Sequence, residues 1–160
     1  MIKVRKILDK ILEIVCVLLF VFITLVGSYQ IITRYVFNSP STISEELLIF
    51  SFTWLSLLAS ALVFGKKEHM RMSFLADKLT GAKATYLAII TEIIIFIFAA
   101  IVLVYGGIKI TSLTMTQITA SLGIVMGYVY VIIPITGVLI LIYNILNIAD
   151  LVSALKLGGN

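Results

Sequence analysis

Long runs without a charged residue alternate with short charged segments along the chain, and this alternation predicts membrane-spanning helices. Residues 14–33 and 47–65 are charge-free runs of 20 and 19 residues. About 20 apolar residues in a helix are enough to cross the hydrocarbon core of a bilayer. A third run, 84–108, contains Glu92 as its one charged residue. One span is therefore expected in each of these three runs.

The fourth run, 110–149, holds 40 residues without a charge and is too long for one span. Seven of the eleven residues in 111–121 are Ser, Thr or Gln, whereas 124–149 is mostly apolar. We therefore predict a polar loop or shallow re-entrant segment at 110–122, followed by a fourth span. A fifth span within this run is the alternative.

Together the runs predict an all-α integral membrane protein that forms a single membrane domain over residues 1–160. The four transmembrane helices are expected at these approximate positions: 12–33, 46–65, 85–108 and 124–149. Composition supports this class, because 61% of the residues are apolar and only 12% are charged. Soluble domains are about 45–50% apolar and about 25% charged.

The basic residues lie in the short segments between the apolar runs, and their distribution predicts the orientation. If the N-terminus is cytoplasmic, ten of the 12 Lys and Arg residues lie on the cytoplasmic side. Cytoplasmic loops of membrane proteins carry such an excess. The formal charge of +4 is thus explained by the orientation of the chain in the membrane, and no nucleic-acid partner is expected. With four spans, both termini are expected in the cytoplasm.

Apolar residues recur at helical spacing before the first span, while Lys3, Lys6 and Lys10 lie on other faces. The apolar residues are Val4, Ile7, Leu8, Ile11 and Leu12. This pattern is typical of an amphipathic helix along the cytoplasmic interface. An early start of the first span explains it equally well.

The residues that metal and enzyme sites require are scarce. The chain has one histidine, His69, and one cysteine, Cys16, which we interpret as a small apolar filler. A bis-histidine haem, a histidine-based metal site and an internal disulfide are therefore excluded. No phosphate-binding glycine loop is present. We expect neither an enzyme nor a cofactor.

Charged residues gather where the first two spans meet outside the membrane. Arg34 ends the first span, Glu45 and Glu46 open the second, and Asn38 begins the turn between them. The spacing Thr42-x-x-Glu45 is that of a capping box, which satisfies free amides at a helix start. The segment predicts a capped hairpin closed by an Arg–Glu pair, or a docking surface for a periplasmic partner.

Glu92 is the one charged residue in the interior of the predicted spans, where such residues are costly and often functional. Asn144 and Asn147 are expected at a similar depth, because the fourth span runs in the opposite direction. We predict a polar clamp between Glu92 and one of these asparagines. A proton or cation site is the alternative.

Trp54 lies well inside the second span, so a packing role against another helix or subunit is expected. Gly106, Gly107, Gly123, Gly127 and Pro134 are expected to permit close helix contact or a kink. The cytoplasmic cluster Lys66, Lys67, His69 and Arg71 is explained by topology, or by binding to lipid phosphates.

Several segments resemble the small membrane subunit of tripartite ATP-independent periplasmic (TRAP) transporters. They are Arg34-Tyr35-Val36-Phe37-Asn38-x-Pro40, Glu45-Glu46-Leu47, Trp54, Glu68-His69-x-Arg71, Leu122-Gly123-Ile124, Tyr128-Val129-Tyr130 and Pro134. Their order and spacing carry the resemblance over about residues 10–150. The chain departs from the family at Ile43, where a tryptophan is frequent, and at Ser73, where an acid is common.

The resemblance implies a division of labour in the bacterial inner membrane. A soluble periplasmic substrate-binding protein would capture an organic acid, such as a dicarboxylate or sialic acid. A large membrane subunit would move it with a sodium gradient, and sodium would bind there. This chain would hold the stationary scaffold of the large subunit and contact membrane lipids, with a bound phospholipid as an option.

A self-contained small transporter or channel, dimeric like small drug exporters, is the alternative function. Glu13 near the start of the first span favours it, although a surface pair with Lys10 explains this residue as well. The sequence does not identify a substrate, because substrate contacts are expected in the other two components.

Overall fold

The computed structural model describes residues 2–66 and 82–157, and these residues are almost entirely helical. In chain order the helices are α1 (Ile2–Tyr35), α2 (Thr42–Gly65), α4 (Ala82–Phe98), the π-helix η1 (Ala99–Gly106), α5 (Gly107–Thr114), α6 (Met126–Tyr130) and α7 (Ile132–Leu157). The described part contains four helices long and apolar enough to cross a membrane: Lys3–Tyr35, Thr42–Gly65, Tyr86–Thr114 and Met126–Ser153. It contains no β-strand, only an isolated bridge between Ile118 and Val125.

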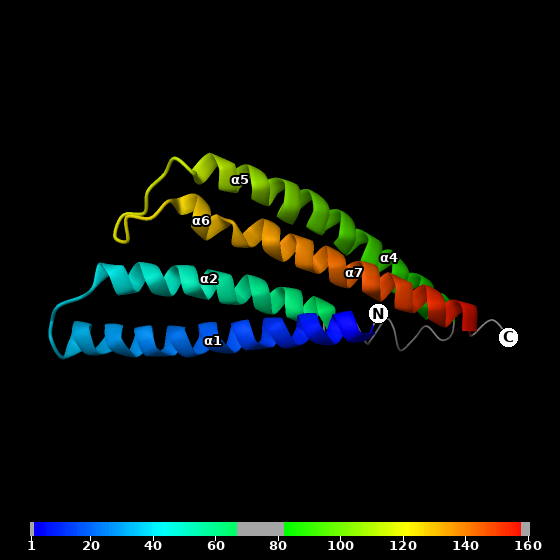
Figure 1. Ribbon diagram of the computed structural model, residues 1–160, viewed down its shortest axis with the longest axis horizontal. Coiled ribbons are helices and arrows are strands. Elements are labelled where there is room, and N and C mark those ends of the chain that lie inside the picture. Colours follow the sequence, from blue (N-terminus) through cyan, green and yellow to red (C-terminus); the bar gives the residue numbers. More distant parts are fainter. Residues whose placement is uncertain (1, 67–81, 158–160) are drawn as a thin grey trace.

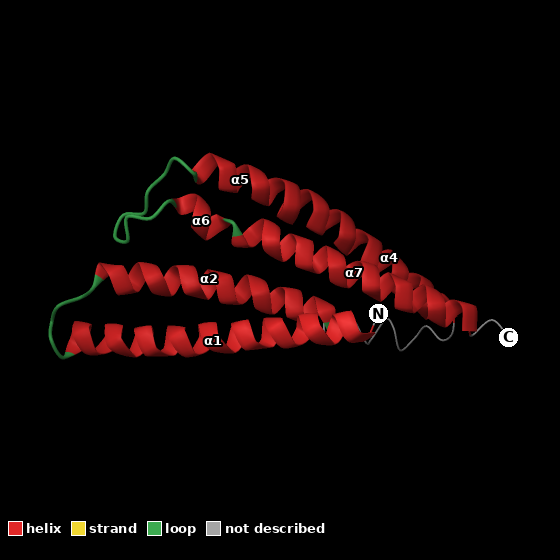
Figure 2. Cartoon of the chain, viewed as in Figure 1, coloured by secondary structure: helices red, strands yellow, loops and turns green. Residues whose placement is uncertain are grey.

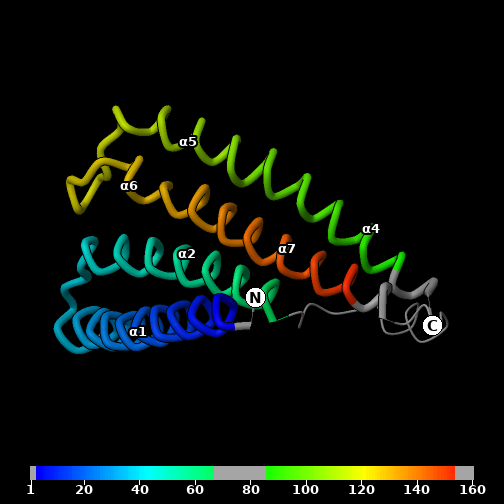
Figure 3. The backbone as a smooth tube through the Cα atoms, turned by 45° about the vertical axis from the view of Figure 1, so that its right-hand side comes forward, coloured from blue at the N-terminus to red at the C-terminus, as the bar shows by residue number. Residues whose placement is uncertain are grey.

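The four long helices lie side by side in one layer, in the order α1, α2, α7, α4 (Figures 1 and 3). At one end, the terminal end, α1 begins and α7 finishes. At the other, the loop end, the α1–α2 and α5–α6 connections lie (Figure 2). Of an apolar 18-residue stretch in each helix, 39% is buried in the fourth long helix and only 6% in the first, so α7 is the central helix and α1 lies at an edge.

Helix α1 runs without interruption from Ile2 to Tyr35, over 34 residues. At 1.5 Å per residue it is about 51 Å long, more than the roughly 30 Å of a bilayer core. Its first turns continue the spanning helix. In these turns Leu12 is buried, with 5% of its surface exposed, whereas Ile7 is 60% exposed. The structure thus does not separate an interfacial helix from the first span, and its position at the membrane surface stays a prediction.

Small residues bring α2, α7 and the third long helix close together. Ala61 and Ala99 are fully buried and form a core cluster with Ile140. A Cβ atom added at Gly107 would lie 2.8 Å from Pro134 Cδ. Small side chains drive this kind of approach in membranes, where packing replaces the hydrophobic effect. A second cluster joins Leu12, Leu58, Ile132 and Tyr143.

The third long helix continues to Thr114 and does not give way to a loop at residue 110, where the polar segment was expected. Thr111 and Thr114 are 7% and 6% exposed, and Thr114 Oγ1 donates to the Ile110 carbonyl over 2.8 Å. A hydroxyl that bonds to its own helix can remain within that helix. The connecting loop therefore covers only 115–125.

The fourth long helix is interrupted once, between α6 and α7 at Val131 (Figure 2). Pro134 lies one turn further on and has no N–H to continue the helical ladder from Tyr130. The expected kink is therefore present, and it leaves backbone carbonyls of α6 available to other donors.

The α1–α2 turn is closed by backbone bonds. Ser39 N donates to Thr33 O over 2.9 Å, and Asn38 takes a positive φ of 49°, which asparagine tolerates. The N-cap of α2 is Ser41, whose hydroxyl accepts from Ser44 N over 3.4 Å. The predicted capping box from Thr42 to Glu45 is therefore wrong by one residue, because the helix begins at Thr42 itself.

Candidate functional site: polar contacts that join the helices

At the terminal end, the structure brings Glu92 of α4 together with Asn144 and Asn147 of α7. Asn144 Nδ2 donates to Glu92 Oε2 over 2.5 Å and to the Glu92 carbonyl over 2.9 Å. Asn147 Nδ2 donates to Glu92 Oε1 over 3.1 Å. The three side chains are 8%, 2% and 1% exposed. Both asparagines, and not just one, therefore contact the carboxylate.

Helix α1 adds two charged residues to this cluster. Arg5 Nη2 donates to Asn147 Oδ1, and Arg5 Nη1 forms an ion pair with Asp150 Oδ2 at 3.1 Å. One turn along, Asp9 Oδ1 accepts from the Tyr143 hydroxyl over 2.6 Å. These bonds connect α1 to α7 past the end of α2, so that the edge helix is held at two points by the central one.

The α2 end joins the same cluster. Lys66 Nζ pairs with Glu13 Oε1 at 2.7 Å. The expected pairing of Glu13 with Lys10 is thus replaced by a contact between two helices. Lys67, His69 and Arg71, which were expected to bind lipid headgroups, lie outside the described residues.

Trp54 contacts the fourth long helix of its own chain. Its indole Nε1 donates to the Val129 carbonyl over 3.0 Å, near the break between α6 and α7. The ring packs against the cluster of Leu12, Leu58, Ile132 and Tyr143. Trp54 therefore has a packing partner within this subunit, as one of the two expected options proposes.

At the loop end, Glu46 of α2 holds the α5–α6 loop. Its Oε2 accepts from Ser121 N over 3.0 Å and from Leu122 N over 2.7 Å. Gly123 follows with a φ of +67°, a conformation that few other residues adopt, and this turn directs the amides at the carboxylate. Two successive backbone amides form a concave site for an anion.

The predicted Arg34–Glu pair is wrong. Within residues 2–66 and 82–157, no carboxylate lies within ion-pair distance of Arg34. Glu46 is taken up by the loop, and Arg34, Asn38 and Glu45 are exposed at the loop end. The residues expected to dock a periplasmic partner therefore remain available, with the exception of Glu46.

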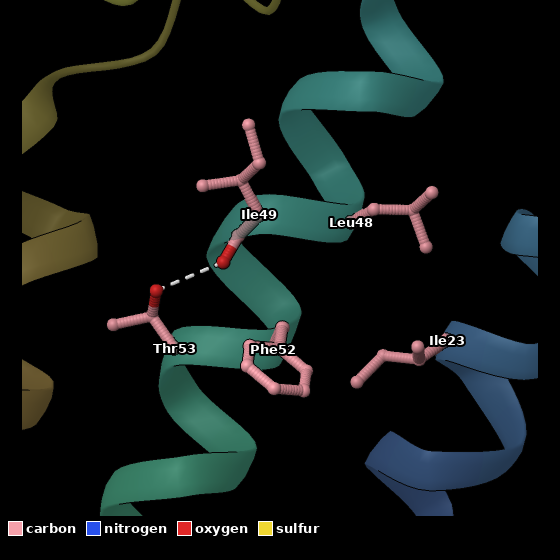
Figure 4. A pocket seen from close by; sticks show the side chains of 5 residues that line it. All are labelled: Ile23, Leu48, Ile49, Phe52 and Thr53. Atoms are coloured by element: carbon pink, nitrogen blue, oxygen red, sulfur yellow. Dashed lines mark hydrogen bonds between the residues drawn. The ribbon is translucent and has the colours of Figure 1, made fainter.

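A shallow apolar groove runs between α1 and α2 on the surface of the layer (Figure 4). Ile23 lines it from α1, and Leu48, Ile49, Phe52 and Thr53 line it from α2. The one hydroxyl in it, from Thr53, donates to the Ile49 carbonyl over 2.9 Å. The groove has no unpaired polar atom to orient a polar ligand and suits an apolar chain.

The polar contacts described above join helices to one another or to a loop. In the part of the chain that the structure describes, no group of three or more His, Cys, Asp or Glu could hold a metal ion. The described contacts connect α1 and α4 to the central α7 at the terminal end. Helix α2 contacts α6 at mid-length and the α5–α6 loop at the loop end.

Sequence reasoning missed the contribution of α1 to the terminal end. Arg5, Asp9 and Glu13 recur every four residues and so share one face of a helix. That spacing was a usable signal for an interhelical polar face. Tyr143 carried no such signal, because a tyrosine in an apolar run is as readily explained by packing.

Comparison with known proteins gives consistent matches. The family model described as "Tripartite ATP-independent periplasmic transporters, DctQ component" matches residues 23–154. A protein of Haemophilus influenzae named "Putative TRAP transporter small permease protein" is 26% identical over 133 residues, or 83% of this chain and 82% of that protein. The "Sialic acid TRAP transporter small permease protein SiaQ" of Vibrio cholerae is 32% identical over 64% of this chain and 59% of its own length. The "Sialic acid TRAP transporter permease protein SiaT" of H. influenzae is 27% identical over 70% of this chain but only 18% of its own length.

Proposed function

Since the chain belongs to the DctQ component family of the TRAP transporters and is a multi-pass inner-membrane protein, we propose that it is the scaffold subunit of such a transporter. It supports a large membrane subunit during sodium-gradient-driven uptake of an organic acid. A periplasmic substrate-binding protein delivers that acid. Sialic acid is the favoured substrate, because two of the similar proteins are named for it, and a dicarboxylate is the second choice.

The scaffold role is supported by the way in which polar groups of this chain bond to one another between its helices. Glu92, the one charged residue in the interior of the predicted spans, is bonded to two asparagines of the same chain. The outward faces of the layer are apolar, for example at Leu18 and Phe52, which are each 64% exposed. A layer held by its own polar contacts, with apolar faces, suits lateral packing against another membrane protein.

The two ends of the layer have different partners in this proposal. The excess of Lys and Arg supports a cytoplasmic position for the terminal end. The exposed Arg34, Asn38 and Glu45 at the loop end then face the periplasm and the substrate-binding protein. Lys66 at the terminal end then lies near lipid phosphates, and phospholipid fills apolar grooves that no protein covers.

Reconstitution tests this function against a self-contained transporter. The chain, a large TRAP permease subunit and a periplasmic substrate-binding protein are combined in proteoliposomes, and uptake of labelled sialic acid is measured with an inward sodium gradient. We expect uptake only when all three components are present. Uptake by this chain alone would replace the scaffold role by a self-contained transporter, and sodium-independent uptake would remove the proposed driving force.

A further inference from the structure

Asn147 of α7 bonds to all three of the other spanning helices. Its Oδ1 accepts from Arg5 of α1. Its Nδ2 donates to Glu92 Oε1 of α4 over 3.1 Å and lies 3.4 Å from the Phe64 carbonyl of α2. With 1% of its surface exposed, Asn147 is sealed inside the layer.

The chemistry of its neighbours determines how this amide is oriented. Arginine only donates hydrogen bonds, and an ionised carboxylate only accepts them. The amide oxygen of Asn147 must therefore face Arg5, and its NH₂ group must face Glu92. The amide dipole then lies between a cation and an anion with its negative end at the cation.

The surroundings of Glu92 select its charged form. Oε1 accepts from Asn147 and Oε2 accepts from Asn144 over 2.5 Å. A protonated carboxyl would direct one O–H toward a group that is itself a donor. Hydrogen bonds from two amides to the two oxygens favour the carboxylate.

We propose that Asn147 bridges two opposite charges that do not touch, the partly buried Arg5 and the buried Glu92, and that Glu92 is a fixed carboxylate that joins α1, α4 and α7. Glu92 then carries neither a proton nor a cation through the membrane. The bridge is a property of this chain alone, whereas the statement on transport rests on the proposed function.

The bridge is tested with a mutant cycle on the purified full chain. Arg5→Gln, Glu92→Gln and the double variant are made with Asn147 intact and again with Asn147→Leu, and Tm is measured in detergent. We expect each single change to lower Tm by several degrees. The double variant should lose clearly less than the sum of the two, because both charges leave together.

With Asn147→Leu, the two changes should become additive, because the bridge is gone. Thr136→Val is the matched control: Thr136 is 1% exposed on the same helix, and its hydroxyl has no partner among the described residues. It should leave Tm nearly unchanged. Additive losses with Asn147 intact would overturn the bridged pair. If a single variant does not fold, recovery of folded protein in the double variant supports the pair, and its absence contradicts it.

The transport statement is tested in the assembled complex. We expect Glu92→Gln to weaken co-purification with the large subunit and uptake together, and Arg5→Gln/Glu92→Gln to restore both. A double variant that assembles normally but takes up nothing would show that the Glu92 carboxyl acts in transport. If the unaltered complex itself shows no uptake, the proposed function fails, while the mutant cycle still decides on the bridge.

Discussion

Helices α2 and α7 approach each other closely at Gly65, which faces the ring of Tyr143. A Cβ atom added there would lie 2.5 Å from Cε1 and 2.6 Å from Cζ of Tyr143. The Tyr143 ring is fully buried, and its hydroxyl is held by Asp9, so the ring has no room to move aside. A glycine is therefore required at the last position of α2 by close contact and not by backbone conformation.

Gly65→Ala should destabilise the subunit, although alanine normally favours a helix over glycine by about 1 kcal/mol. Overpacking of a tight contact costs about 1–3 kcal/mol and should dominate. Gly106→Ala is the control, because its added Cβ would meet its closest atom at an ordinary 3.6 Å. Tm in detergent should fall for Gly65→Ala and stay equal or rise for Gly106→Ala; equal behaviour of the two would contradict the contact.

Trp54→Phe should remove the bond to the Val129 carbonyl and leave that group without its indole donor. Hydrogen bonds between membrane helices contribute on the order of 1 kcal/mol, and the smaller ring also loses packing. We expect a lower Tm for Trp54→Phe and little change for Phe52→Leu, whose ring is 64% exposed on the same helix. A larger loss for Phe52→Leu would argue against this role of Trp54.

At the scale of elements, the α5–α6 loop depends on a helix that is distant in sequence. Glu46 is 75 residues from Ser121, and its carboxylate supplies the acceptor for two loop amides. The loop also bonds within itself, from Thr119 N to Ile124 O over 2.8 Å. Its shape is thus a joint product of the α2 start and of its own turn at Gly123.

Glu46→Ala should therefore release the loop while leaving the helices in place. Hydrogen bonds to a charged group contribute about 1.5–3 kcal/mol, so the amides of Ser121 and Leu122 should exchange hydrogen on the order of tenfold faster or more. Hydrogen exchange followed by mass spectrometry measures this. Glu45→Ala, at an exposed neighbouring position, should leave loop exchange unchanged; equal protection in both variants would refute the contact.

The sequence predicts the elements well where apolar runs and charges mark them, and less well at their ends. Glu92 and the α7 asparagines could be paired beforehand, because depth and direction follow from the order of the spans. The end of the third long helix at Thr114 could not be predicted. A threonine in a polar stretch is compatible with a loop, and equally with a helix in which its hydroxyl donates to a backbone carbonyl of the same helix. The partners of Glu46 could not be predicted either, because they are backbone amides, which nearly every residue has.

At the scale of the whole molecule, one layer of four helices leaves both of its faces open. Residues such as Leu18 and Phe52 are exposed although they are large and apolar. In a bilayer this exposure carries no penalty, because lipid tails are as apolar as these side chains. Lipid or partner helices can therefore cover either face without change in the layer.

The orientation of this layer is open to direct measurement. In a Cys16→Ser background, Ser39→Cys at the loop end should react with a membrane-impermeant maleimide from the periplasmic side. Ser153→Cys near the end of α7 should react only after permeabilisation, because the excess of Lys and Arg predicts a cytoplasmic terminal end. Labelling of Ser153→Cys before permeabilisation would reverse the proposed topology.

The central place of α7 has a consequence for how the protein is made. α7 is the last of the four described spanning helices in chain order, yet it lies between α2 and α4, which enter the membrane earlier (Figure 1). Until it arrives, Arg5 and Glu92 lack the asparagines that hold them. A chain that stops before residue 132 lacks both asparagines that donate to Glu92, and an ionisable residue in the bilayer without such donors is costly.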